Sequence, residues 1–329
     1  MLVKSLVTIV IALFWRDDLG RRHGVLGRSV VSHGISPALM AVSSDDARDT
    51  EHWAGYVAAA GEYYGTVARI NAWGLKLKPG QISSSVVWLS SDEGNNQIMA
   101  GFLISPDTYN DTDLHFFVSW TADGFNSTGC LDTYCRGFVP SSTPAASLSP
   151  GSTVAQPSVY HGKQTDYAIT IQKGMHLSRI RALNSTRLGV YVQVARNWWL
   201  YVDVSGRQEP IGYFPASLFT GAALADHAAL VGWGGSAQSS GGGGGVASPP
   251  SPPMGSGHGP REELGGSAYM ASIGVLDARG KSSAPAAANV TSLAGDDAHD
   301  ECGYGASGFE VTHDDGAFFY YGGPGGCHH

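Results

Sequence analysis

Charged residues are scarce in this chain, and those present lean acidic. Asp, Glu, Lys and Arg make up 15% of the 329 residues, whereas about a quarter is usual in globular proteins. The net charge is −8 at pH 7, and the acidic excess is scattered along the chain. This balance argues against nucleic acid or an anionic membrane as the main partner.

The local signatures of common hydrolases and nucleotide-binding proteins are also missing. The sequence has no G-x-S-x-G elbow and no H-E-x-x-H pair, and its histidines are dispersed. Its long glycine run is not followed by G-K-[ST], and nearby prolines forbid the helix that a phosphate-binding loop would open. We therefore expect no metal site and no cofactor.

Only four cysteines occur, and their spacing does not suit zinc. Cys130 and Cys135 form a C-x4-C pair with no second close pair and no histidine at finger spacing. Of the three possible pairings, the simplest joins Cys130 to Cys135 and Cys302 to Cys327. That pairing implies an oxidising compartment. Four reduced core cysteines are the alternative.

Long apolar runs are absent except at the N-terminus, where Leu6–Trp15 resembles the core of a signal peptide and is too short to span a bilayer. No A-x-A cleavage site follows, so an anchor, a degraded leader and a wrong gene start are all open. Residues 1–51 are interpreted as a leader or linker. Four N-x-[ST] sequons agree with a secreted, glycosylated protein, at Asn110, Asn126, Asn184 and Asn289.

From His52 onward, short runs rich in Val, Ile, Tyr, Phe and Trp alternate with clusters of Gly, Pro, Asn and Ser. Such runs are typical of strands joined by turns. Only Pro215–Val231 looks helical, and only in part. Many strands with little helix predict an all-β sandwich or barrel. The predicted strands are 54–57, 66–71, 84–90, 98–104, 114–120, 166–172, 197–204, 211–214, 267–275 and 318–323.

Two segments interrupt this texture. Residues 174–195 are more basic than their surroundings and are interpreted as an added hairpin or inserted surface loop. Residues 234–253 are rich in Gly, Ser and Pro and are predicted to form a flexible loop. Both lie within a single domain predicted over residues 52–327.

One predicted strand has two apolar faces. In NQIMAGFLISP, a period of two directs Ile98, Phe102 and their alternate neighbours one way, and Met99 and Gly101 the other way. We therefore expect this strand to be covered on both sides.

The stretch MGSGHGPREE is the one polar cluster that looks organised. It combines small residues, which allow close backbone approach, with His258, Arg261, Glu262 and Glu263. It is interpreted either as the rim of a cleft or as an ordinary turn that carries solvated charges.

The order of several motifs resembles the C-terminal domain of the neprosin family of plants. The resemblance runs from about His52 to Cys327. It implies a sandwich of two antiparallel β-sheets, secretion, the two disulfides proposed above, and a preceding propeptide, which residues 1–50 do not resemble. The motifs are HWAGYV, EYYGTVARINAW, SSVVWLSS, FFVSWTADGFNSTGCLDTYCRGFV, RNWWLYV, GYFPASLF, LVGWGGS, MGSGH and FFYYGGPGGC.

The resemblance also implies a chemistry, proline-directed endopeptidase action at acid pH by two glutamates. One carboxylic acid must donate a proton while the other, ionised, takes a proton from the attacking water. Met99 stands where the family's E-A-G-W stretch has its glutamate, and Ser236 stands where its W-G-G-E stretch ends in one. The family's catalytic pair is therefore absent. The cleft candidates are Gly101, Trp233, Gly235, His258 and Glu262.

Three interpretations remain open. The chain is a catalytically impaired protein that binds extended proline-containing peptides or cell wall, an active peptidase that uses substitute acids, or the product of a drifting or mis-assembled gene. The substitutes considered are Asp92, Glu93, Glu262 and Glu263, none of which occupies a strand position equivalent to Met99. The additional residues 174–195 are then a genuine lobe or retained non-coding sequence. We expect a secreted monomer.

Overall fold

The structure of the protein is a computed structural model, and its described part comprises most of the chain after residue 49. The predicted leader and nearly all of the segment 174–195 lie outside it. The described residues are 50–91, 94–142, 148–174, 196–204, 206–219, 223–240, 248–293, 302–312 and 316–328.

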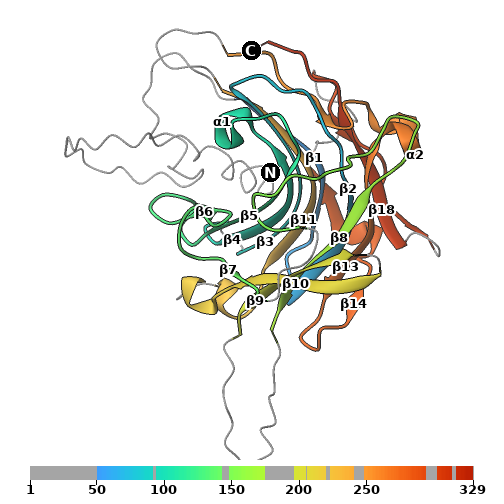
Figure 1. Cartoon of the computed structure of the whole chain (residues 1–329). Coiled ribbons are helices and arrows are strands. Elements are labelled where there is room, and N and C mark those ends of the chain that lie inside the picture. Colours follow the sequence, from blue (N-terminus) through green and yellow to red (C-terminus); the bar gives the residue numbers. More distant parts are fainter. Residues whose placement is uncertain are drawn as a thin grey trace, which may run out of the picture.

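Two antiparallel β-sheets lie face to face and form a sandwich, as predicted (Figure 1). The first has seven strands in the order β15-β1-β11-β3-β4-β5-β6. Its strands are β1 (Thr50–Ala58), β3 (Gln81–Ser90), β4 (Gln97–Ile104), β5 (His115–Thr121), β6 (Cys130–Leu131), β11 (Leu230–Ser239) and β15 (Val290–Ser292).

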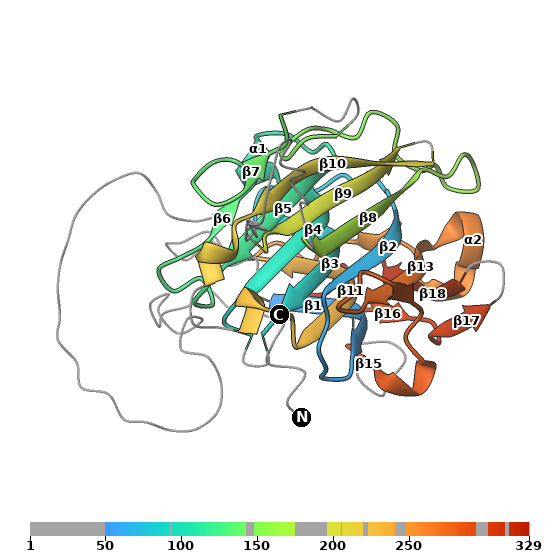
Figure 2. The ribbon, with the colours of Figure 1, turned by 90° about the horizontal axis from the view of Figure 1, so that it is seen from below.

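The second sheet has eleven strands, of which eight follow the order β12-β18-β13-β2-β8-β9-β10-β7. In addition β14 pairs with β13, and β16 and β17 pair with β18 (Figure 2). The strands are β2 (Gly65–Asn71), β7 (Val139–Pro140), β8 (Asp166–Lys173), β9 (Trp198–Val204), β10 (Arg207–Phe214), β12 (Met254–Gly255), β13 (Ala268–Leu276), β14 (Ser282–Ser283), β16 (Gly305–Ala306), β17 (Glu310–Thr312) and β18 (Gly316–Gly323).

Helix is confined to short pieces, and no helix of the described residues is long and apolar enough to cross a membrane. The partly helical prediction for Pro215–Val231 corresponds to two 3₁₀ turns, after which β11 begins. The pieces are α1 (Pro106–Tyr109), α2 (Glu263–Gly266), η3 (Ala216–Phe219), η4 (Ala223–Ala225), η5 (Pro260–Glu262) and η6 (Ala287–Asn289).

The inward positions of the two sheets share one apolar core. The Trp233 side chain from β11 is fully buried there, and its indole Nε1–H donates to Thr66 Oγ1 on β2 of the other sheet at 2.8 Å. The rings of Phe102 on β4 and Tyr167 on β8 lie 5.4 Å apart across the same interface. These contacts hold the sheets together and satisfy the indole donor inside the core.

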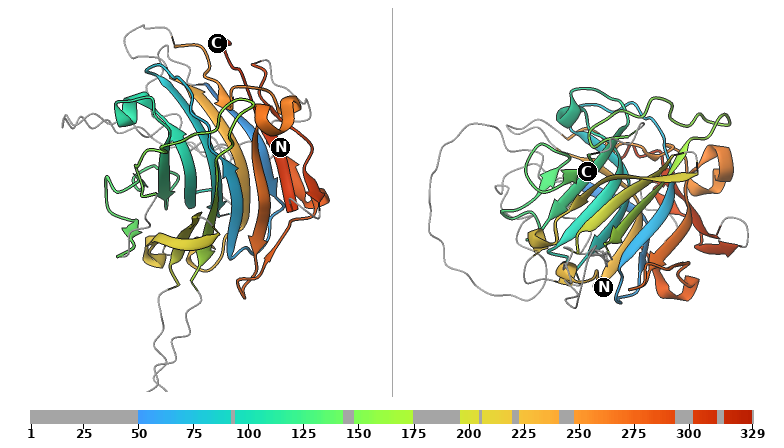
Figure 3. Two further views of the ribbon diagram at one scale, coloured as in Figure 1. Left: turned by 45° about the vertical axis from the view of Figure 1, so that its right-hand side comes forward. Right: turned by 60° about the horizontal axis from the view of Figure 1, so that its bottom comes forward.

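The seven-stranded sheet also carries a second apolar cluster, on the side directed away from its partner. We call this side the outer face; the sheet is curved, and α1 lies on this side of it (Figures 1 and 3). Met99, Trp88 and Leu103 belong to this cluster, whereas Ile98 and Phe102 belong to the inter-sheet core. The prediction that this strand is covered on both sides is therefore confirmed.

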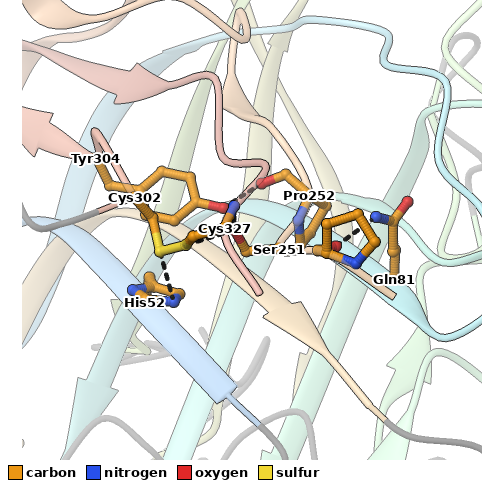
Figure 4. Close-up of a disulfide and its surroundings, with 8 residues drawn as sticks. His52, Gln81, Ser251, Pro252, Cys302, Tyr304 and Cys327 are labelled. Carbon is orange, nitrogen blue, oxygen red and sulfur yellow. Dashed lines mark hydrogen bonds between the residues drawn. A yellow bond between two sulfur atoms is a disulfide. The ribbon is translucent and has the colours of Figure 1, made fainter. Parts of the chain in front are cut away.

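Two disulfides join the cysteines in the predicted pairs, Cys130 with Cys135 and Cys302 with Cys327. The second links the C-terminal segment to the segment before β16 (Figure 4). The C-terminal segment is also held by the backbone N–H of Ser251, which donates to the Cys327 carbonyl at 2.9 Å. The two disulfides are thus covalent crosslinks that stabilise the sandwich.

Two predicted boundaries differ from the structure. Strand β1 begins at Thr50, ahead of the predicted domain start at His52, because it pairs with β11 along its whole length. The predicted flexible loop 234–253 was wrong in its first part, since β11 continues to Ser239. Backbone pairing with β1 and β3 on both sides stabilises this glycine-rich stretch as strand.

Gly101 provides a test of how tightly β4 packs against β3. An added Cβ at Gly101 would lie 2.0 Å from the Ser85 carbonyl oxygen. We expect Gly101→Ala to lower the free energy of unfolding by about 1–3 kcal/mol, because the backbones must separate to admit the methyl group.

Urea denaturation measures this effect. Gly259→Ala is the matched control, since its φ is −73° and a Cβ there meets nothing within 4 Å. A Gly101→Ala protein as stable as this control would contradict the close approach.

Candidate functional site

Met99 and Ser236 both lie on the outer face, but they are not cross-strand neighbours. Met99 on β4 is opposite Trp88 on β3, whereas Ser236 on β11 is opposite Ser84 on the same strand. Two strand spacings and four residues along β3 therefore separate them, roughly 16 Å between Cα atoms in a flat sheet.

Met99 is packed in the outer apolar cluster and is 1% exposed. Its strand neighbour on β5 is Ser119, whose buried hydroxyl has no hydrogen-bond partner among the described residues. A carboxyl group at position 99 would be surrounded by apolar side chains, which would raise its pKa and keep it protonated. The thioether offers no proton in its place.

Ser236 is fully buried, and its Oγ lies 2.8 Å from Ser84 Oγ. Either hydroxyl can be the donor. In the described part of the chain, no histidine or carboxylate contacts the Ser236 hydroxyl, so nothing there activates it as a nucleophile or base.

The other cleft candidates divide between the two faces of the sheet. Gly101 lies on the outer face, in the same strand as Met99. Trp233 and Gly235 point into the inter-sheet core instead; a Cβ on Gly235 would meet the Tyr321 ring. These two residues therefore pack between the two sheets and do not line the outer face.

His258 and Glu262 lie elsewhere, beside α2 at the margin of the eleven-stranded sheet and far from α1 (Figures 1 and 2). Glu262 bridges two partners: its Oε1 is 2.9 Å from His258 Nδ1 and its Oε2 accepts from the Tyr160 hydroxyl at 2.7 Å. The Tyr160 and His258 rings stack at 4.3 Å. The structure thus joins these two predicted residues to each other, but not to Met99 or Ser236.

The same contacts decide the charge of Glu262. The hydrogen bond from Tyr160 and the bond with His258 lower the pKa of the Glu262 carboxyl. It is an ionised, half-exposed surface carboxylate. Glu263 is exposed nearby, and Asp92 and Glu93 lie outside the described residues. No substitute acid proposed from the sequence is placed on the outer face.

Sequence reasoning missed Glu51, which lies on the outer face at the start of β1. From the sequence, Glu51 is interpreted as part of the linker, because the runs of Val, Ile and aromatic residues that are typical of strands begin only at His52. Burial raises the pKa of Glu51 well above its ordinary value, an effect that the nearby Trp53 indole only partly offsets. The alternation of β1 was the available signal, since Glu51, Trp53 and Val57 share one face.

A second missed carboxyl, Asp132, follows β6 at the other edge of this sheet. It is 2% exposed and accepts hydrogen bonds from Val118 N–H at 3.0 Å and the Tyr109 hydroxyl at 2.8 Å. The Tyr109 ring stacks on His115 at 3.8 Å. Burial raises the pKa of Asp132 to about 6, so this carboxyl changes charge in mildly acidic solution.

The one group of metal-ligand atoms found among the described residues is His52 with Cys302 and Cys327. Their ligand atoms lie within 4.8 Å of one another (Figure 4). The two sulfurs are bonded to each other, so neither is available as a thiolate ligand.

The predicted glycosylation sites are accessible where the structure describes them. Asn110, Asn126 and Asn289 are all exposed. Asn184 lies outside the described residues.

Comparison with known proteins finds a matching family and similar solved structures. The model of the Neprosin family matches residues 79–324. A crystal structure of scytalido-glutamic peptidase with a peptide-based transition state analog is similar at 8% identity, with a TM-score of 0.43, over 83% of this chain and 98% of that one. A second, with a transition state analog inhibitor, is similar at 8% identity with a TM-score of 0.41 over the same shares. So distant a likeness says nothing about chemistry.

The fold and disulfides define a two-sheet β-sandwich of the kind consistent with an extracellular protein. The chain belongs to the neprosin family, whose model covers most of its length.

The buried Asp132 predicts a measurable pH dependence of stability. An aspartate in the unfolded chain has a pKa of about 3.9, and the folded value is about 6. Because the folded pKa is raised, this group's contribution is complete below about pH 4 and is lost as pH rises through about 6. Relative to Asp132→Asn, the wild type should lose about 2 kcal/mol of unfolding free energy between pH 4 and pH 7.

Thermal or urea unfolding at several pH values measures this difference. Asp113→Asn alters an exposed carboxylate and should track the wild type. An Asp132→Asn protein that follows the wild-type profile throughout would show that this carboxyl is ionised in the fold across the range.

Proposed function

We propose that this protein is a secreted, monomeric member of the neprosin family that binds extended peptides, including proline-containing ones, without cleaving them by the family's glutamic mechanism. The observation that carries the proposal is the chemistry at positions 99 and 236. Both side chains are neutral, buried and already accommodated by their neighbours.

The loss of both acids removes the proton transfers that peptide hydrolysis requires. General acid–base catalysis contributes on the order of 10²–10⁴ for each participating group. Met99 cannot give or take a proton usefully, and Ser236 bonds only to another hydroxyl, that of Ser84. A water molecule on the outer face would therefore not be activated by either residue.

The scaffold around these positions is nevertheless intact, which favours a binding role over decay. The outer face has Trp53 and Trp88 in edge contact, with ring centroids 5.6 Å apart. The Ser236 hydroxyl, which pairs with that of Ser84, is on the residue directly opposite Trp53. Aromatic rings beside hydrogen-bonding groups are the usual means of holding an extended peptide.

We expect purified protein not to cleave proline-containing peptides between about pH 3 and pH 5, where a pair of glutamic acids could share the acid and base roles. Mass spectrometry after prolonged incubation measures cleavage. Fluorescence anisotropy with the same labelled peptides measures binding, which we expect to be saturable.

The Glu262→Gln/Glu263→Gln double variant is the control for substitute acids. Robust cleavage by the wild type that survives in this variant would refute the non-catalytic assignment. Absence of saturable peptide binding at every pH would refute the binding role.

Restoring the acids tests whether the scaffold still supports catalysis. We expect Met99→Glu/Ser236→Glu to gain acid-dependent cleavage, because both carboxyl groups would enter buried surroundings that raise their pKa values. The appearance of product over time at about pH 4 is the measurement.

The matched control is Met99→Gln/Ser236→Gln, which has nearly the same size but cannot exchange protons. Equal cleavage by the two double variants would show that the carboxyl groups are not responsible. Circular dichroism of both variants verifies that the sheets still form.

A further inference from the structure

Three polar atoms at one end of the outer face are buried without a well-formed hydrogen bond, although the Trp53 indole lies near enough to Glu51 to lower the pKa of its carboxyl. They are Glu51 Oε1 and Trp53 Nε1 on β1 and Gln238 Oε1 on β11. Buried polar atoms are nearly always paired, so an unpaired set on one surface calls for an explanation. Seven such side-chain atoms are found among the described residues, and these three lie together.

The strand register brings the three side chains into one patch. Glu51 is directly opposite Gln238, and Trp53 is directly opposite Ser236, in the antiparallel pair of β1 and β11. Directly opposite side chains have Cβ atoms about 5 Å apart. Glu51 is also the diagonal neighbour of Ser236, within reach of a long side chain. The Glu51 carboxyl therefore lies beside the position where the family has its second glutamate.

The burial of these side chains shows that the polar groups of the patch are removed from water. Gln238 is 4% exposed, so its amide oxygen has lost water and gained no partner in return. Glu51 and Trp53 are each partly exposed as residues, although their unpaired atoms are themselves covered. Leaving such groups unpaired disfavours the fold, and a ligand that satisfies them offsets that cost.

The chemistry of the three groups matches one kind of ligand. Trp53 Nε1–H can only donate, and Gln238 Oε1 can only accept. A protonated Glu51 carboxyl adds a second donor. A secondary amide presents the complement, a carbonyl oxygen for the donors and an N–H for Gln238.

We infer that Glu51, Trp53 and Gln238 form a subsite that binds one N–H-bearing peptide group of the ligand. This inference rests on the peptide-binding function proposed above and specifies which group of the peptide is bound. The subsite should prefer an ordinary peptide bond to the bond before proline, because the latter has no N–H for Gln238. Proline residues of a bound peptide are thus expected to lie on either side of it.

Binding should also weaken as pH rises. Glu51 donates only while protonated, and burial raises its pKa. The other outward positions of β1, β11 and β3 carry no titratable side chain. Two titratable groups of other elements lie on or beside this face. Asp107 on α1 accepts from the Gly80 N–H at 2.6 Å, next to the end of β11, and His115 on β5 is in the row of Ser236, four strands from β1. Loss of the pH dependence in Glu51→Gln would assign it to Glu51.

The experiment uses the full chain and two small probes. N-methylacetamide contains one peptide group with an N–H, whereas N,N-dimethylacetamide lacks the N–H. The chain has eight tryptophans, so its indole N–H signals are few in an NMR spectrum, and Trp53→Phe assigns the one that matters. We expect N-methylacetamide to shift the Trp53 signal saturably and N,N-dimethylacetamide to shift it less.

Variants of the subsite residues test whether the amide probes and the labelled peptide bind to the same groups. Gln238→Leu should abolish the discrimination between the two amides and weaken peptide binding about threefold to tenfold. Glu51→Gln should bind with the affinity that the wild type has at low pH, but independently of pH. Glu310→Gln, an exposed glutamate on β17, is the matched control and should behave as the wild type.

The outcomes separate the subsite from the wider function. Peptide binding that is unaffected by both Gln238→Leu and Glu51→Gln would overturn the subsite and leave the binding function standing. A Trp53 shift with N-methylacetamide, but no peptide binding, would support the subsite and overturn the function. No Trp53 shift with either amide would overturn the subsite.

Discussion

Burial of β4 on both of its faces is the constraint on which the rest of the structure depends. Phe102 and its inward neighbours close the core between the sheets, while Met99 and Leu103 anchor the apolar cluster on the outer face. A strand so enclosed can carry an ionisable group only at a large cost in desolvation. Methionine is a natural replacement for an acid there, because its flexible thioether fills irregular apolar space.

The carboxyl groups that remain near the outer face lie towards its two edges. Glu51 is at the start of β1, and Asp132 follows β6 at the far edge of the sheet. Both have raised pKa values because burial disfavours the charged form. Five strand spacings separate β1 from β6, so these carboxyls cannot form a catalytic pair. Each carboxyl group on this surface can therefore form hydrogen bonds to a ligand, but the two cannot act together as an acid–base pair.

Much of the architecture could be predicted from local patterns. Alternation in Leu114–Trp120 and in Ile98–Ile104 predicted strands, and turn residues between the runs predicted antiparallel neighbours. The pairing of Cys302 with Cys327 is the simplest of the three possible pairings and is implied by the resemblance. Glu51 could not be recognised in the same way, since its significance depends on Gln238, which lies far along the chain and meets it only through strand register.

The sequence by itself determined the family resemblance, the all-β class and the absence of glutamates at positions 99 and 236, because each of these depends on residue identity and on the order of local motifs. Only the tertiary structure decided which face each residue occupies and which distant residues meet. It directed Trp233 and Gly235 inward, joined His258 to Glu262 on a separate surface, and brought Glu51 beside Ser236. Strand order and register fix the face and the neighbours of each residue. Both depend on pairing between distant segments, which short-range spacing in the sequence does not specify.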